Sequence, residues 1–150
     1  MRTFFACGWS TAAGVPVGVM VAPVIPAITD HEMEAILAAS RAAGATSASY
    51  VLLRLPHEVK QLFREWLAEH YPDRAGHVMS LINQSRGGKD YDSKFGQRMS
   101  GTGPYAELLR TRFELARRKC GFESTSRRHE LSTALFRPPA TDQPQLSLGF

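Results

Sequence analysis

The chain has 150 residues, of which 43% are hydrophobic, and this length and composition predict one compact domain. Its formal net charge is +4, and residues 86–150 carry the excess, with 12 Lys and Arg against 7 Asp and Glu. The two cysteines, Cys7 and Cys120, lie far apart in the sequence, which excludes a disulfide framework and a zinc or iron-sulfur site built from cysteines of this chain alone.

An apolar run between residues 15 and 28 is the first feature of the chain. It contains three prolines and is shorter than a membrane-spanning helix, so we expect a cytoplasmic protein without membrane contact. Its β-branched residues follow one another almost without interruption instead of alternating with polar residues. That pattern predicts a strand that is buried on both faces of a parallel sheet.

A helix and a second strand follow this run. Thr29 and Glu32 have the spacing of a capping box, and the helix that it opens is predicted to end at Gly44. Residues 45–56 form a second apolar run, which ends at a proline. The order strand, helix, strand implies two parallel strands joined by a right-handed crossover.

Three further helices are predicted from apolar residues at helical spacing, over residues 57–71, 74–82 and 104–120. Asp73 is the expected cap of the second of them. In the third, Leu108 is expected on the buried face and Arg117 on the exposed face. These patterns make the second half of the chain mostly helical.

Composition divides the chain into four parts. They are an unpatterned leader (1–12), the strand and helix units (13–72), a mostly helical extension with a glycine-rich basic loop (73–122) and a disordered tail (123–150). Two strands alone leave one face and both edges of a parallel sheet open. The sequence therefore predicts a sheet that needs further strands.

Two segments of the chain resemble a known enzyme family. The first, GVPVGVMVAPVIPAITDHEMEAILAASRAAGATSASYVLLRLPHEVKQLFREWL, is similar to the later strands of the partial (β/α) barrel of radical SAM proteins. The second, RGGKDYDSKFGQRMSGTGPYAELLRTRFELA, is similar to the segment that follows in the DNA repair photolyase-like subgroup, which is related to spore photoproduct lyase. The resemblance implies an α/β fold, the C-terminal portion of a partial (β/α) barrel, with residues 13–72 as its last strand and helix units.

The resemblance also implies an enzyme that binds S-adenosylmethionine (SAM) and a [4Fe-4S] cluster, cleaves SAM reductively and abstracts hydrogen with the resulting radical. The family holds its cluster through a CxxxCxxC motif, because such clusters require thiolate ligands. This chain has no CxxxCxxC motif. We therefore expect the C-terminal part of such an enzyme, separated by truncation, a misplaced start or a frameshift, which by itself retains neither cofactor nor radical activity.

Arg54 and Pro23 lie near the ends of the two predicted strands, where the resemblance places SAM. Arg54 fits a bidentate pair with the SAM carboxylate, and it fits equally well a surface ion pair that closes the strand end. No catalytic residue is predicted. The histidines show no HExxH or HxH spacing, so no metal site is expected from them.

The glycine-rich loop carries four cations, at Arg86, Lys89, Lys94 and Arg98. Tyr91 and Phe95 lie between them, and this interleaving fits contact with a nucleic-acid backbone and stacking on bases, so that DNA is a candidate partner. Asp90 and Asp92 in the same loop fit local ion pairing instead. The alternative interpretation of the loop is a structural cap over the barrel mouth.

The last six residues, QLSLGF, resemble the short peptide of the form QLSLF by which bacterial repair and replication proteins bind the DNA sliding clamp. Its anchors would be Gln145, Leu146, Leu148 and Phe150, with Gly149 as an insertion relative to that form. The alternative function, from a different class, is therefore a non-catalytic interaction module that binds nucleic acid or the sliding clamp.

Overall fold

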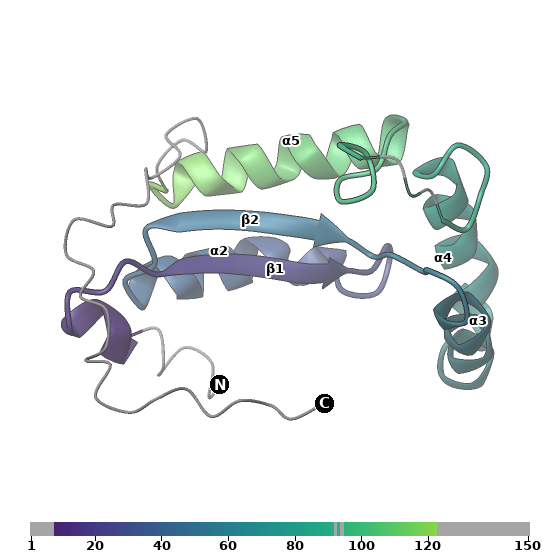
Figure 1. Ribbon diagram of the computed structural model, residues 1–150, viewed down its shortest axis with the longest axis horizontal. Helices are drawn as coiled ribbons and strands as arrows, with labels where there is room; N and C mark the ends of the chain where they lie inside the picture. Colours follow the sequence, from purple (N-terminus) through teal and green to yellow (C-terminus); the bar gives the residue numbers. More distant parts are fainter. Residues whose placement is uncertain (1–7, 92, 94, 123–150) are drawn as a thin grey trace, which may run out of the picture.

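The computed structural model describes residues 8–91, 93 and 95–122. The elements in chain order are β1 (Gly18–Val24), η1 (Asp30–Glu32), α2 (Met33–Ala42), β2 (Ser47–Leu52), α3 (Val59–His70), α4 (Pro72–Gln84) and α5 (Pro104–Lys119). The fold is mixed α/β, with the predicted order of strand, helix, strand and then helices (Figure 1).

The sheet has two strands, β1 and β2, which are parallel as the sequence predicts. Their register places Gly18 beside Ser47 and Val24 beside Leu52, with an irregularity after Val21. The backbone N–H of Leu53 donates to the carbonyl of Val24 at 3.0 Å, so the two strands end side by side. Their carboxyl ends therefore share one edge of the molecule.

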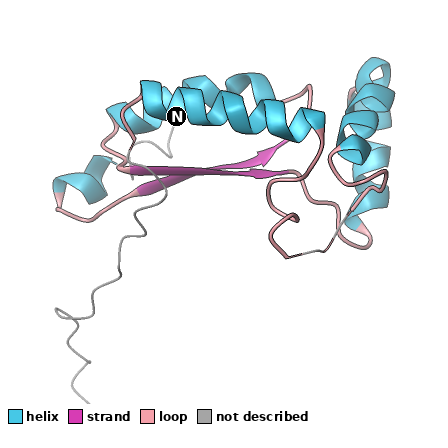
Figure 2. Cartoon of the chain, turned by 90° about the horizontal axis from the view of Figure 1, so that it is seen from above, coloured by secondary structure: helices cyan, strands magenta, loops and turns pink. Residues whose placement is uncertain are grey.

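Helices α2 and α5 both cover the same face of this sheet (Figure 2). The core between sheet and helices includes Met33 and Leu37 of α2 together with Leu109 and Phe113 of α5. The strand residues that reach this core alternate along β2 and along β1 up to the irregularity after Val21, and they are Val19, Val21, Val24, Ala48, Tyr50 and Leu52. This face holds the larger of the two hydrophobic clusters.

The opposite face of the sheet, which we name the open face, carries Gly18, Met20, Ala22, Ser47, Ser49 and Val51. Its largest side chain, Met20, is 64% exposed. The prediction that the first strand is buried on both faces is therefore wrong for the part of the chain that the structure describes. β1 has no polar residue on either face, and this gives the continuous apolar run, although helices cover only one face.

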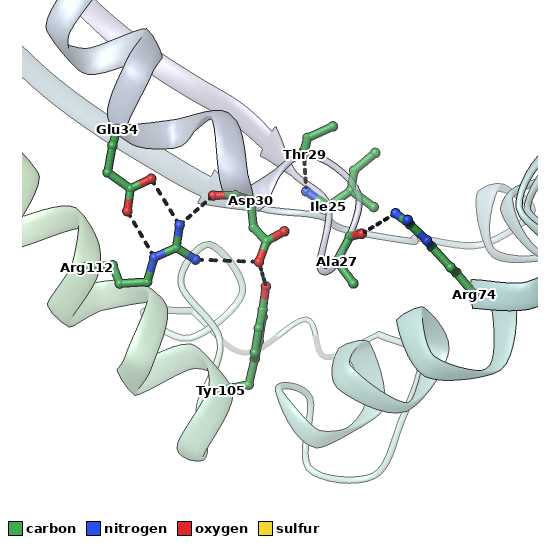
Figure 3. A network of polar contacts seen from close by, with 8 residues as sticks. All are labelled: Ile25, Ala27, Thr29, Asp30, Glu34, Arg74, Tyr105 and Arg112. Atoms are coloured by element: carbon green, nitrogen blue, oxygen red, sulfur yellow. Dashed lines mark hydrogen bonds and ion pairs between the residues drawn. The ribbon is translucent and has the colours of Figure 1, made fainter.

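The beginning of α2 also differs from the prediction. Thr29 makes no capping hydrogen bond, and its hydroxyl instead accepts from the backbone N–H of Ile25 at 2.9 Å. A single 3-10 turn, η1, then leads into α2. Thr29 thus closes the turn after β1 and does not form a capping box with Glu32 (Figure 3).

Helices α3 and α4 form a separate hairpin beyond the carboxyl ends of the strands (Figure 1). Leu67, Val78 and Ile82 are buried in a second cluster between them. Pro72 occupies the first turn of α4 and Tyr71 is its N-cap, so Asp73 lies inside the first turn and is not the predicted cap. On α3, Leu62 points its apolar side chain into solvent, because the hairpin covers only part of the amphipathic face.

Helix α5 matches its predicted bounds, but two side chains on it are reversed. Leu108 is exposed, whereas Arg117 is 6% exposed and donates to Glu114 Oε2 through Nε at 3.0 Å and Nη2 at 2.7 Å. Helical periodicity places charged residues such as Arg117 on the exposed face. Arg117 is buried instead because its ion pair with Glu114, three residues earlier, compensates its charge.

The segment before β1 contains helical residues 8–12, although the sequence there shows no apolar period. The hydroxyl of Thr11 donates to the carbonyl of Ala43 at 3.4 Å, which joins this segment to the connection between α2 and β2. In the described residues, no helix has the length and apolar character needed to cross a membrane.

Candidate functional site

The candidate site lies at the carboxyl edge of the sheet, where β1 and β2 end and the loop between α4 and α5 returns to them. The carbonyl of Met99 in this loop accepts from the backbone N–H of Leu52 at 2.9 Å. The loop therefore runs against the end of β2. In α/β folds this edge is the usual place for ligands, because the strand ends and the following loops surround one space.

Arg86 fixes the loop in this position. Its Nη1 donates to the carbonyls of Gln97 and Arg98 at 3.2 and 3.0 Å. Its Nη2 donates to the carbonyls of Leu52 and Leu53 at 3.3 and 2.9 Å. The side chain is 2% exposed, so the guanidinium is committed to four backbone carbonyls. The prediction that Arg86 contacts a nucleic-acid backbone is therefore corrected: this arginine joins the loop to the end of β2.

Gly101 allows the close approach of the loop to β2. Its φ is +74°, and a Cβ there would lie 2.9 Å from Leu52 Cδ2 and 3.0 Å from the Ser85 carbonyl oxygen. Both the conformation and the contact require glycine. Part of the glycine-rich composition is thus explained by packing of the loop on the strand end.

Arg54 follows β2 and also contacts the loop. Its Nη2 donates to the Tyr91 hydroxyl at 3.2 Å, and its guanidinium carbon lies 5.9 Å from the centre of the Tyr91 ring. Its Nη1 lies 3.8 Å from Met99 Sδ. Within the described residues Arg54 forms no ion pair, so the predicted surface pair is replaced by an aromatic contact. Its buried Nε has no acceptor among the described residues.

Pro23 is exposed on β1, one residue before the strand ends. Its carbonyl oxygen lies 3.4 Å from the Thr29 hydroxyl. Because Val24 pairs with Leu52, Pro23 and Arg54 belong to the same carboxyl edge. Both residues proposed for SAM therefore lie near strand ends on this edge, and the contacts of Arg54 are with the loop, whereas Pro23 contacts Thr29.

The outer part of the loop carries an exposed aromatic residue and a cation. Phe95 is 91% exposed, and the guanidinium carbon of Arg98 lies 5.4 Å from the centre of its ring. Lys89 is exposed as well, whereas Lys94 lies outside the described residues. Asp90 pairs with Arg64 of α3 at 2.8 Å, so this predicted local ion pair forms with a helix outside the loop.

A polar network connects α5 to η1 and α2 (Figure 3). Arg112 binds Glu34 through two hydrogen bonds of 3.0 Å and donates to the carbonyl of Asp30 at 3.0 Å. The Tyr105 hydroxyl donates to Asp30 Oδ2 at 3.1 Å. The network fixes the start of α5 beside the turn that follows β1. No sequence pattern identifies it, because each of its hydrogen bonds joins residues more than 70 positions apart.

The charges in this network shift the pKa values of three groups. Partial burial would raise the pKa of Glu34, but the hydrogen bonds and charge of Arg112 lower it below its ordinary value. The hydrogen bond with Glu34 raises the pKa of Arg112. Burial and the nearby Asp30 carboxylate raise the pKa of Tyr105, so the phenol remains protonated. These shifts fit an anchor between elements.

The residues present do not fit a [4Fe-4S] cluster. The motif of the radical SAM family supplies three thiolates, and this chain contains two cysteines in all. Cys7 lies outside the described residues. Cys120 follows α5 near Phe122, whose ring receives the guanidinium of Arg41 at the end of α2, far from the carboxyl edge (Figure 1). Among the described residues no three His, Cys, Asp or Glu side chains could hold a metal ion together.

The predicted clamp-binding residues, Gln145, Leu146, Leu148 and Phe150, lie outside the described residues. Comparison with protein-family models, with curated proteins and with solved structures found no match to this chain.

Proposed function

We propose that this chain is the C-terminal part of a radical SAM enzyme of the DNA repair photolyase-like subgroup, and that β1 and β2 are the last strands of its partial barrel. The observation that carries the proposal is the one-sided sheet. In a (β/α) barrel the helices cover the outer face of each strand, and the inner face looks onto the lumen. Here α2 and α5 cover one face, and the open face carries mostly small side chains (Figure 2).

The carboxyl edge supports the same proposal. Barrel enzymes bind their ligands at this edge. Arg54 and Pro23 lie there, and the loop between α4 and α5 is fixed against it by Arg86. In this proposal the loop forms part of the wall around the cofactor. Arg54, which follows β2, contacts the Tyr91 ring of that loop.

Because the cysteines of the chain do not form the family's motif, we propose that the chain alone performs no radical chemistry. The test is anaerobic reconstitution of the full chain with iron and sulfide, followed by measurement of bound iron and of SAM cleavage. We expect less than one cluster per chain and no cleavage product. Stoichiometric iron together with SAM cleavage would contradict the proposal.

A second function, binding of single-stranded nucleic acid, is favoured by Phe95. An aromatic ring that is 91% exposed and has a guanidinium beside it resembles the stacking contacts of proteins that bind single strands. Lys89 adds an exposed cation to the same loop. This function requires no cofactor and would be retained by the chain alone.

Fluorescence anisotropy with a labelled oligothymidine at several salt concentrations tests this second function. Phe95→Ala should weaken binding by about 5-fold or more, because base stacking contributes about 1–3 kcal/mol per base. Lys60→Ala is the matched control, since Lys60 is an exposed cation on α3 and should leave the affinity within about 2-fold. Affinity that falls with Lys60→Ala but not with Phe95→Ala would show nonspecific attraction to a basic surface and would contradict a stacking site.

A further inference from the structure

A groove lies between α2 and α5, in the helical layer that covers the sheet. Its volume is about 460 Å³, which is in the range of pockets that bind small molecules, so it can hold more than one aliphatic side chain. Its lining includes Glu34 and Ala38 of α2, Leu115 and Lys119 of α5 and, directly after α5, Cys120. Leu115 is 55% exposed, so the described residues leave a large apolar side chain uncovered at the groove.

The described part of the chain ends beside this groove. Arg112 of α5 binds Glu34 near the start of α2, and the ring of Phe122 receives the guanidinium of Arg41 near the end of α2. The two helices therefore run in the same direction. The chain leaves α5 at the end of the groove that Cys120 lines.

Residues 123–150 continue the chain from this end of the groove, and two stretches of their sequence carry several large apolar residues. The first stretch is LSTALF, residues 131–136, in which Leu131, Ala134 and Leu135 have the i, i+3, i+4 spacing of one helical face. The second is QLSLGF at the end of the chain. The first stretch is the nearer of the two to the groove along the chain.

The length of the connection allows the first stretch to reach the groove. Residues 123–130 separate it from Phe122, and an extended connection of this length spans up to about 30 Å. The part of α5 between Arg112 and Cys120 is about 12 Å long, because an α-helix rises about 1.5 Å per residue. The chain can therefore reverse direction after Phe122 and place the stretch along the groove.

Charge also favours this stretch as the occupant. Lys119 is exposed at the end of the groove, and it has no ion-pair partner among the described residues. Glu130 directly precedes the stretch, so its carboxylate reaches Lys119 when Leu131 enters the groove. A short linker holds a tethered segment at an effective concentration in the millimolar range, which favours a segment of the same chain over a second copy.

We infer that residues 131–136 bind in the groove between α2 and α5 of the same chain, with Leu131 and Leu135 against Leu115. Binding covers the apolar surface that the described residues leave open at Leu115. The inference departs from the prediction of a disordered tail for these six residues only, and it leaves QLSLGF free for a partner. It does not depend on the proposed radical SAM function.

The rate at which iodoacetamide, an uncharged probe, alkylates Cys120 tests the inference in the full chain with Cys7→Ser. Cys120 lines the groove, so an occupant slows its reaction. Leu135→Asp should speed the alkylation by about 5-fold or more, because it places a charge in an apolar site and releases the segment. Thr133→Asp is the matched control: it adds the same charge on the opposite helical face of the stretch and should leave the rate within about 2-fold.

Three results would overturn the inference. The first is a rate in Leu135→Asp that equals the rate in the Cys7→Ser parent or the rate in Thr133→Asp. The second is faster alkylation in Leu148→Asp but not in Leu135→Asp, which would assign the groove to QLSLGF. The third is protection of Cys120 that is lost when the protein is diluted, which would assign the groove to a second copy.

Discussion

The two faces of the sheet differ in what covers them. The face under α2 and α5 holds the larger hydrophobic cluster, with Met33 and Leu37 fully buried. The open face carries small or hydroxyl side chains and an exposed Met20. A continuous apolar pattern in a strand therefore does not show that both faces are buried. A strand without charges can lie against helices on one face and toward solvent or a barrel lumen on the other.

The largest expected effect is the difference in stability loss between truncating a side chain on the covered face and truncating one on the open face. Phe113→Ala removes a ring that is 3% exposed and packs against Tyr50 of β2, with 4.8 Å between ring centres. It should lower the free energy of unfolding by about 3–5 kcal/mol, as large-to-small core substitutions do. Met20→Ala on the open face should lower it by less than about 1 kcal/mol. Urea unfolding under conditions where both variants are monomeric measures the difference, and equal losses would contradict the one-sided core.

Arg86 provides a second comparison, between a buried and a half-buried arginine of the same loop. Arg86→Met should lower the free energy of unfolding by about 3 kcal/mol, because it leaves buried carbonyls without a donor. Arg98→Met should change it by less than about 0.5 kcal/mol, since the Arg98 side chain rests on the exposed Phe95 ring. Thermal or urea unfolding compares them. A stable Arg86→Met variant would show that the loop does not depend on this anchor.

The smallest expected effect is a pH dependence of stability that comes from Glu34 on α2. The pKa of Glu34 is lower in the folded chain than the ordinary value of 4.5, so its contribution to stability is present above about pH 4.5 and is lost as the pH falls through the folded pKa. Glu34→Gln should therefore be less stable than the parent at pH 7, by less than about 1 kcal/mol because the pair is partly exposed. At pH 3 the difference should shrink.

Glu69→Gln is the control for this pH dependence, because Glu69 is exposed on α3. Urea unfolding of both variants at pH 7 and pH 3 makes the measurement. A Glu34→Gln penalty that is the same at the two pH values would mean that the variant acts through packing and not through the charge of Glu34.

The local elements could be predicted from the sequence because each has its own short-range signal. Apolar spacing predicted the helices, and the two apolar runs separated by a helix predicted parallel strands. Thr29 shows the limit of such signals, since the same spacing permits a capping box or a closed turn, and the backbone of Ile25 decides between them. The boundaries of α4 moved for a similar reason, because Pro72 fits the first turn better than Asp73 fits the cap.

The sequence could predict which segments form the site, but not the contacts between them. Arg54 and the basic loop do meet at one edge, and Pro23 lies near the end of the neighbouring strand, because parallel strands end on the same side. The interior role of Arg86 could not be predicted, since its acceptors at Leu52 and Leu53 lie more than 30 residues away. The burial of an arginine depends on carbonyls that only the folded chain assembles.

The most direct test of the central claim is the nucleotide sequence upstream of the Met1 codon, translated in every frame. The account predicts barrel strands and a CxxxCxxC motif that lead into AAGVPVGVMVAP directly or after one change of frame. An upstream sequence that encodes no such segment would contradict the assignment to a radical SAM barrel, and nucleic-acid binding by the loop would then become the function to test.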